Sequence, residues 1–323
     1  MPVFTVKVPA HYDKGERLDK YIASLPNGMN RSKLKIGVSE ILINRKKSKL
    51  SQKVNANDLI DISWEDNIPE NIEPENIPLD IIYEDENVTV VNKAQGMVTH
   101  PACGNWNGTL VNALLYHWGR EAVKQVKEGS EQKIMEFRRP GIVHRLDKET
   151  SGIIITAKNR DVEEYLGQQF RQKTLRKEYI LIVKGRPPAV AGDIRTQIIR
   201  DPKDRKRFKA VENTSEGKYA RTLYHCISSY GNYTLVRVRL KTGRTHQIRV
   251  HMKYLGCPIV GDPVYNKVDP IFPDATLMLH SKLLQITFPG EDKPRTFITQ
   301  TPKRFLEMEK KLKQMYNKKE FTK

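Results

Sequence analysis

The stretch GIVHRLDKETSG, residues 141–152, concentrates ionisable side chains between two apolar segments. The ionisable residues are His144, Arg145, Asp147, Lys148 and Glu149. A carboxylate among cations stays ionised, so Asp147 could act as a nucleophile or as a general base. The apolar runs on either side, 142–143 and 153–158, predict buried strands that would hold the loop rigid, as an active site requires. A surface turn with paired charges would fit this stretch equally well.

The tetrapeptide RLDK of this loop also occurs at residues 17–20. There, Leu18, Tyr21 and Ile22 have the i, i+3, i+4 spacing of a single helix face. Asp19 falls outside that face, beside basic residues, so we expect it to be solvated and without a chemical role. The two copies are therefore predicted to have different functions.

A second stretch, LKTGRTHQIRVHMKYLG (240–256), could supply a partner for Asp147. The strand before it should end near residues 242–243, and a helix should begin near Thr245. Ile248, Met252 and Leu255 recur at helical spacing and should face the core. Arg249 lies at the edge of that face, where a guanidinium can reach a carboxylate. Arg244 is the competing candidate for the same role.

The sequence offers little that would bind a metal. His246 and His251 are five residues apart, which differs from the i, i+4 spacing of helical zinc ligands, and no Glu lies between them. Cys103, Cys226 and Cys257 are scattered and form no CxxC pair. We therefore expect no metal site. A metal-dependent hydrolase would need a set of four histidines, namely His100, His144, His246 and His251.

The charge balance points to a polyanionic partner. The 323 residues carry a formal net charge of +18, which favours binding to RNA, DNA or an anionic membrane surface. The chain shows no apolar leader and no run long enough to span a bilayer, so we expect a cytoplasmic protein without membrane association. Its length suggests about two domains, and we expect a monomer.

Residues 65–80, EDNIPENIEPENIPLD, predict a linker because three prolines and six acidic residues leave few apolar positions. We expect a first domain, with the linker, over 1–75 and a second over 76–323. The first should contain helices at 17–23 and 31–39 and strands at 41–44 and 58–64.

The second unit combines hairpins and helices. Residues 79–93 predict a hairpin, residues 108–118 and 162–170 predict helices, and residues 177–185 and 233–243 predict strands. This order is not a βαβ series, so the fold class should be α+β.

HRLDKETSG, KEYILIVKG and TGRTHQIRVH, in this order and spacing, resemble the RluA family of pseudouridine synthases, which isomerise uridine in RNA. QGMVTHP (95–101), GTLVNALL (108–115) and IVGDPVY (259–265) match as well, so the resemblance runs from about Leu79 to Pro289. The first unit resembles an S4 RNA-binding domain. That unit, with RDPKDRKRFKA (200–210), is similar to the branch that acts on large-subunit ribosomal RNA, although the charged stretch 119–138 is longer than this branch would suggest.

The resemblance implies a mixed, mainly antiparallel catalytic core, a small α/β S4-like domain and no cofactor. It implies Asp147 as the catalytic carboxylate, Arg249 as its two-pronged partner and Tyr179 as the active-site tyrosine. RNA contacts are expected from His144, Arg145, Arg244 and His246 in the core, and from Arg17, Lys20, Arg31, Lys33, Lys35, Arg45 and Lys46 in the S4-like unit.

Several alternatives remain open from the sequence. Asp147 could attack C1′ or abstract a proton at C2′, and the target uridine cannot be deduced from side chains because structured RNA is recognised largely by shape. The substrate could be transfer RNA instead of ribosomal RNA. A non-catalytic S4-type RNA-binding factor is the alternative outside the enzymes.

Overall fold

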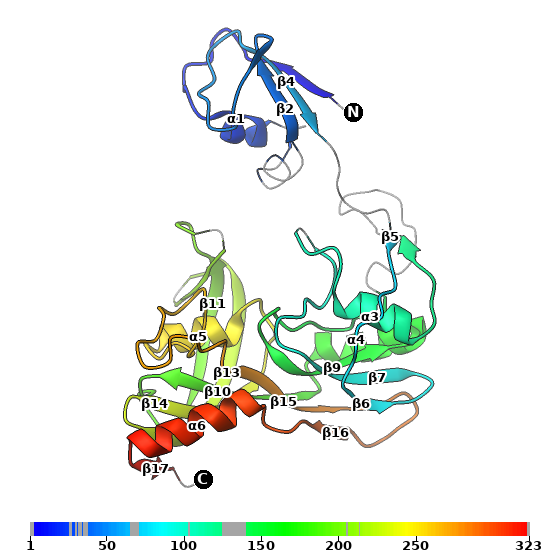
Figure 1. The fold of residues 1–323 in the computed structure, drawn as a ribbon, viewed down its shortest axis with the longest axis vertical. Coiled ribbons are helices and arrows are strands. Elements are labelled where there is room, and N and C mark those ends of the chain that lie inside the picture. Colours follow the sequence, from blue (N-terminus) through cyan, green and yellow to red (C-terminus); the bar gives the residue numbers. More distant parts are fainter. Residues whose placement is uncertain are drawn as a thin grey trace. The chain divides into compact units, whose positions relative to one another are not determined.

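The computed structural model describes residues 3–25, 28–29, 31, 34, 38–64, 71–102, 104–124, 140–204, 206–212 and 214–321. The chain divides into two compact units, Met1–Pro69 and Glu70–Lys323 (Figure 1). The sequence placed this boundary after residue 75. However, strand β5 (Asn71–Ile72) pairs with β8 (Val123–Lys124) within the second unit. Ile72 is buried in the core of that unit, so the end of the predicted linker is part of the second fold.

In its described residues, the first unit contains a four-stranded antiparallel sheet with the order β1-β4-β2-β3 and the short helix α1. Its elements are β1 (Val3–Lys7), α1 (Leu18–Ser24), β2 (Val38–Ile43), β3 (Lys46–Lys47) and β4 (Leu59–Trp64). Leu18 and Ile22 of α1 share one apolar core with Ile60 and Ile62 of β4. The predicted helix at 17–23 and the strands at 41–44 and 58–64 are confirmed. Of the helix expected at 31–39, residues 31 and 34 are helical, residues 38 and 39 belong to β2, and the others lie outside the described residues.

Asp19 contradicts the expectation that it is solvated. Its side chain is fully buried, and it accepts hydrogen bonds from Arg17 Nε at 3.0 Å and from Arg31 Nη2 at 2.5 Å. The reason is that the segment after β3 covers the first turn of α1, with the Asp19 amide donating to the Leu50 carbonyl. The helical spacing of apolar residues cannot predict that a later segment of the chain buries Asp19. Arg17 and Arg31, expected to contact RNA, are therefore held at least in part by an internal carboxylate.

The second unit is built on an eleven-stranded sheet, and its strand pairs are antiparallel apart from β9 and β15, among the pairs that the structure describes. Nine strands follow the order β12-β11-β13-β14-β10-β15-β9-β7-β6, β16 pairs with β15, and β17 pairs with β13. The α+β class and the mixed, mainly antiparallel sheet are confirmed. The strands are β6 (Ile81–Glu84), β7 (Val88–Lys93), β9 (Ser151–Ala157), β10 (Arg176–Lys184), β11 (Ala191–Arg200), β12 (Phe208–Val211), β13 (Lys218–Tyr230), β14 (Tyr233–Leu240), β15 (Leu279–Ile286), β16 (Arg295–Ile298) and β17 (Lys318–Glu320).

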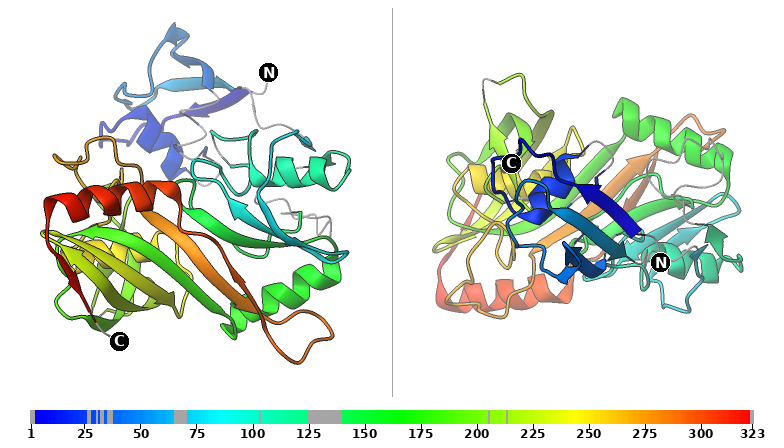
Figure 2. Two further views of the ribbon diagram at one scale, coloured as in Figure 1. Left: turned by 60° about the horizontal axis from the view of Figure 1, so that its bottom comes forward. Right: turned by 90° about the horizontal axis from the view of Figure 1, so that it is seen from above.

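Four helices accompany this sheet in the described part of the chain: α3 (Leu110–His117), α4 (Arg160–Gln172), α5 (Gln247–Tyr254) and α6 (Lys303–Met315). The predicted hairpin is β6–β7, and the predicted helices at 108–118 and 162–170 are α3 and α4. The C-terminal helix α6 packs on the sheet through Phe305, Met308 and Leu312 (Figure 2). No described helix is both long and apolar enough to cross a membrane.

The strand that follows the HRLDKETSG loop lies in the middle of the sheet. Strands β7 and β15 flank β9, and every residue of β9 is buried because both faces of the strand are covered. Ile153 and Ile155 lie in one apolar core with residues of α4, and Ile154 lies in another with residues of α3. Gly152 has φ +112°, and a Cβ at this position would lie 2.3 Å from the Ser281 carbonyl oxygen. Glycine is therefore required where β9 begins its parallel pairing with β15. This close approach fixes the end of the loop that carries Asp147.

We predict that Asp19→Asn destabilises the first unit by about 1–2 kcal/mol, because it removes charged hydrogen bonds whose arginine partners remain partly hydrated. Burial would raise the pKa of Asp19, but Arg17 and Arg31 outweigh it and hold the pKa below the ordinary 3.8. The stabilisation is therefore present above pH 3.8 and is lost as the pH falls further. Hydrogen exchange of residues 18–24 in the full chain measures it, and wild-type protection in the variant at pH 7 would contradict the prediction.

Candidate active site

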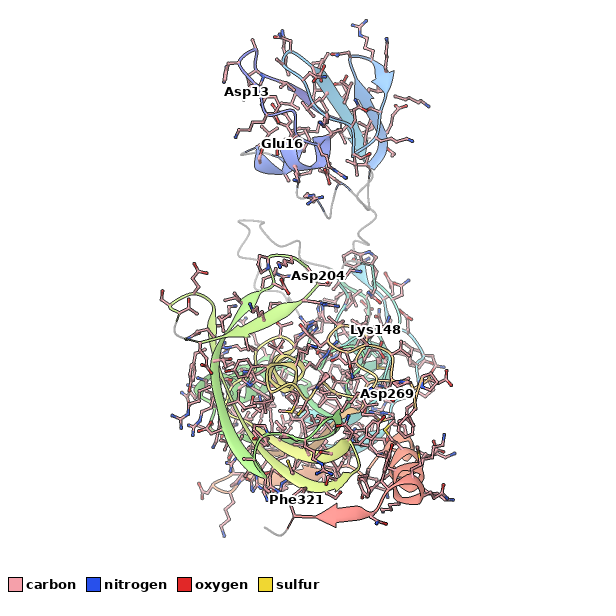
Figure 3. The ribbon with its side chains drawn as sticks, turned by 90° about the vertical axis from the view of Figure 1, so that its left-hand side faces the viewer. Asp13, Glu16, Lys148, Asp204, Asp269 and Phe321 are labelled. Carbon is pink, nitrogen blue, oxygen red and sulfur yellow. The ribbon has the colours of Figure 1, made fainter. Side chains whose placement is uncertain are left out.

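A cleft of about 940 Å³ in the second unit brings together the residues expected around Asp147. Its walls come from the loop before β9, the start of β10, the end of β14 and the start of α5. All seven core residues predicted from the sequence line it: His144, Arg145, Asp147, Tyr179, Arg244, His246 and Arg249. In Figure 3, Lys148 marks the loop that carries Asp147.

Asp147 and Arg249 form an ion pair, with Arg249 Nη1 donating to Asp147 Oδ2 at 3.2 Å. The side chain of Asp147 is 22% exposed, whereas that of Arg249 is 5% exposed. The carboxylate can therefore reach a molecule in the cleft, while the guanidinium stays behind it in the protein. Arg244 does not take this role, since its Nε donates to the Tyr219 carbonyl.

The two-pronged contact of Arg249 is made with Asp262, which corrects the expectation that it would be made with Asp147. Arg249 Nε and Nη2 each donate to one Asp262 oxygen at 2.8 Å. Burial would raise the pKa of Asp262, but the hydrogen bonds and charge of Arg249 outweigh it and hold the pKa below its ordinary value. Asp262 also accepts from the amides of Val264 and Tyr265. Sequence reasoning missed this residue, although it lies in the IVGDPVY motif.

His246 also faces Asp147. Its Nε2 lies 3.8 Å from Asp147 Oδ2, and its Nδ1 lies 2.8 Å from the Tyr265 hydroxyl. The residue has φ +56° and ends the turn before α5, which begins at Gln247 instead of near Thr245. Burial lowers the pKa of His246 against the opposing charge of Asp147. At neutral pH the imidazole is therefore neutral.

Tyr179 lies in β10, between Val238 of β14 and Ser281 of β15. It is buried in the wall of the cleft, and burial raises its pKa to about 12 despite a hydrogen bond with Ser281. The phenol therefore stays protonated at physiological pH and offers a neutral aromatic surface.

His144 and Lys177 share one aromatic partner, Phe170 of α4. The His144 ring stacks on Phe170 at 4.4 Å, and its Nε2 accepts from the Ile155 amide. Burial, with the nearby charge of Lys177, lowers the pKa of His144 to about 3. Lys177 Nζ lies 5.2 Å from the Phe170 ring centre, and burial lowers its pKa to about 8. Sequence reasoning missed Lys177, although it is two residues before Tyr179 and therefore on the same strand face.

Side chains of the QGMVTHP segment and of Lys93 donate hydrogen bonds to backbone carbonyls of the loop that carries Asp147. Thr99 Oγ1 donates to the Leu146 carbonyl, and Gln95 Nε2 donates to that of Glu149. The buried Lys93 directs Nζ at three carbonyls, including that of Lys148. From the other side, Arg304 of α6 donates to the Ser151 hydroxyl. These bonds fix the backbone on both sides of Asp147.

The four histidines of the hydrolase alternative do not form a metal site. His251 lies between the hydroxyls of Thr196 and Thr222, and His100 Nδ1 contacts the Pro101 carbonyl. Within the described residues, no group of three or more His, Cys, Asp or Glu could hold a metal ion.

The basic residues predicted for the first unit differ in their surroundings. Lys20, Arg45 and Lys46 are exposed, whereas Arg17 and Arg31 bind Asp19. Lys33 and Lys35 lie outside the described residues, as does most of the charged stretch 119–138.

We predict that Arg249→Ala lowers the free energy of unfolding of the second unit by about 3–5 kcal/mol, because it strands the buried Asp262 carboxylate. The pKa of Asp262 is held below 3.8 in the wild type. The difference in the free energy of unfolding between variant and wild type should therefore have its full size at neutral pH and become smaller as the pH falls below 3.8. Denaturant unfolding from pH 7 to 3 measures it. Arg244→Ala is the control and should cost about 1 kcal/mol or less, since it removes one hydrogen bond.

Comparisons with known proteins identify the family of this chain. Residues 87–254 match the family model described as RNA pseudouridylate synthase. The chain is 44% identical over 310 residues to the ribosomal large subunit pseudouridine synthase D of Borreliella burgdorferi, covering 94% of this chain and 90% of the relative. It is 38% identical to an uncharacterized RNA pseudouridine synthase of Bacillus subtilis, covering 88% of each.

Solved structures show the same fold. Human RNA pseudouridylate synthase domain containing 1 superposes with a TM-score of 0.56 at 23% identity, covering 77% of this chain and 92% of that one. The family match spans the Asp147 loop, β10 and α5, so the resemblance seen in the sequence is confirmed. This chain belongs to the RNA pseudouridylate synthase family, whose members are isomerases that act on RNA.

Proposed function

We propose that this protein isomerises uridine to pseudouridine in large-subunit ribosomal RNA, with Asp147 as the catalytic carboxylate. The observation that carries the proposal is the geometry of Asp147, a partly exposed carboxylate in the cleft that is backed by a buried guanidinium. The name of the relative at 44% identity supports ribosomal RNA as the substrate. We further propose that the protein works in the cytoplasm and as a monomer.

The reaction breaks the N1–C1′ bond, turns the base and joins C5 to C1′. Nothing is oxidised and no group is imported, so the protein has to supply one ionised carboxylate beside the sugar, as nucleophile at C1′ or base at C2′. Arg249 donates a hydrogen bond to the carboxylate of Asp147, and Asp262 holds Arg249 in place. Among the described residues, the polar contacts of Asp147 with Arg249 and His246 both reach Oδ2, which leaves Oδ1 for the reacting carbon.

The target base must leave its stack before C1′ can be reached, and flipped bases are held by aromatic and apolar walls. We propose that Tyr179 provides such a wall, since it is a neutral phenol in the same cleft as Asp147. Arg145, exposed on the mouth of the cleft, is our candidate for the residue that helps displace the nucleotide. His144 is bound by Phe170 and the Ile155 amide, so we assign it to shaping the wall.

We propose that the first unit is an S4-like RNA-binding domain. Lys20, Arg45 and Lys46 are exposed on it, and phosphate contacts from such residues would anchor the enzyme without reading the sequence.

Deleting the gene and mapping carbodiimide-modified pseudouridines across ribosomal and transfer RNA tests the function. Loss of signal in 23S ribosomal RNA supports the proposal, loss in transfer RNA alone assigns the other substrate, and no loss in either contradicts the activity.

Asp147→Asn is expected to lower the single-turnover rate by several orders of magnitude while RNA affinity stays near the wild-type value. The change is nearly isosteric and removes the group proposed to react. Asp274→Asn, at an exposed position, is the matched control and should react at the wild-type rate. If Asp147→Asn retains activity within about tenfold of wild type, the assignment is wrong.

Affinity for RNA should fall as the pH rises through about 8, because Lys177 then loses its charge in the cleft. Lys177→Met should bind more weakly at pH 7 and lack this pH step. The pKa of Lys93 is also lowered to about 8, but Lys93 does not line the cleft, so the Lys177→Met comparison separates the two. Lys173→Met, exposed on the cleft, should weaken binding but keep the step. Equilibrium binding from pH 6.5 to 9.5 measures both.

Deletion of residues 1–69 should leave the second unit folded and weaken its RNA binding, because each unit has its own core. The plot of log affinity against log salt should become less steep by roughly 0.7–0.9 for each RNA phosphate that the first unit neutralises. The cut is placed before Ile72, which the second unit buries. An unchanged salt slope would show that the first unit does not touch RNA.

A further inference from the structure

Asp147 and His246 leave a gap of defined size in the cleft. Nε2 of His246 lies 3.8 Å from Oδ2 of Asp147, which is too long for a hydrogen bond. Nε2 has no hydrogen bond with the residues that the structure describes. An oxygen atom could lie about 2.8 Å from both atoms at once, since that is an ordinary hydrogen-bond length. The two side chains therefore form a binding position for one small polar group.

The imidazole is held rigidly toward this gap. Its Nδ1 is 2.8 Å from the hydroxyl of Tyr265, and the rings of Tyr265 and Phe208 meet it edge-on at 5.6 and 5.7 Å. The backbone of His246 is in the left-handed region, with φ +56° and ψ 15°. Such a conformation is uncommon for a residue other than glycine and is kept where the surrounding structure imposes it.

The hydrogen bonds of Tyr265 decide which ring nitrogen carries the proton. The Tyr265 oxygen already accepts from the Phe208 amide at 2.9 Å, and in the described part of the chain His246 Nδ1 is the acceptor in reach of its own proton. Nδ1 is then an acceptor, and the proton of the neutral ring lies on Nε2. Burial, which lowers the pKa of His246, keeps the ring in this neutral form at pH 7. The gap thus has a donor on one side and a carboxylate acceptor on the other.

A hydroxyl group fits this pair, because it accepts one hydrogen bond and donates another. We propose that His246 recognises the 2′-hydroxyl of the target nucleotide, donating from Nε2 to the 2′-oxygen while the hydroxyl donates to Asp147 Oδ2. The inference rests on the proposed function, which brings C1′ and C2′ of the ribose to Asp147. It makes His246 a residue that selects ribose over deoxyribose, since the 2′-hydroxyl is what distinguishes RNA from DNA at one position.

The test is a cycle of two enzymes and two substrates. The substrates are a synthetic RNA oligonucleotide around a mapped target uridine and the same oligonucleotide with 2′-deoxyuridine at that one position. The enzymes are the wild type and His246→Asn, since Asn tolerates the left-handed backbone. Single-turnover kcat/KM is measured for all four pairs, and thermal unfolding checks that the variant is folded.

His246→Asn should lower kcat/KM on the ribose substrate by about tenfold, the scale of one hydrogen bond, and should change the deoxyribose value little. His246→Gln, whose amide nitrogen can reach the place of Nε2, should recover part of the preference for ribose. Equal losses on both substrates would overturn the proposal, because a contact with phosphate or a purely structural role would act on both alike. Wild-type enzyme that leaves the ribose substrate unmodified would instead contradict the proposed function itself.

Discussion

A single buried guanidinium links the two carboxylates on which the site depends. Arg249 binds Asp262 with two nitrogens and Asp147 with the third, so one positive charge is shared by two negative ones. The side chain of Asp262 is fully buried and that of Asp147 is partly exposed, so the two carboxylates have different surroundings. The buried carboxylate fixes the direction of the guanidinium, and the partly exposed one faces the cleft. Because breaking such a buried pair is costly, the loop, α5 and the IVGDPVY turn are constrained to keep one arrangement.

The same cluster extends to the backbone of β12. Tyr265 follows Asp262 in the turn, lies under the Arg249 guanidinium at 5.1 Å, and binds both His246 and the Phe208 amide. The residues around Asp147 are therefore held by contacts within the protein before RNA arrives. This organisation suits a reaction in which positioning and electrostatics supply most of the rate, since groups already in place need not be reorganised during the reaction.

Sequence patterns predicted those features that local rules determine. The helical spacing of Leu110 and Leu114 predicted α3, and the alternation of Val236 and Val238 predicted β14, because each pattern reflects one buried face. Asp147 was found from its charged loop and Arg249 from its position on a predicted helix face, whereas Tyr179 was found because its motif resembles that of a known family. Asp19 was misjudged because its burial depends on a segment some thirty residues later in the chain. Asp262 was missed because nothing in its local sequence shows that it lies beside Arg249. Two of the three guanidinium nitrogens of Arg249 bind Asp262, and only the third binds Asp147.

The hydrogen bond from Arg304 to Ser151 has a consequence for the folding of the enzyme during its synthesis. The two residues are 153 positions apart, and Ser151 also binds His280, 129 positions away. Contacts of such long range form late, after the chain between them has been ordered. During synthesis, the segment that carries Asp147 emerges well before the helix that secures it. A nascent chain thus holds every residue of the HRLDKETSG motif before the contacts of Ser151 with His280 and Arg304 can form.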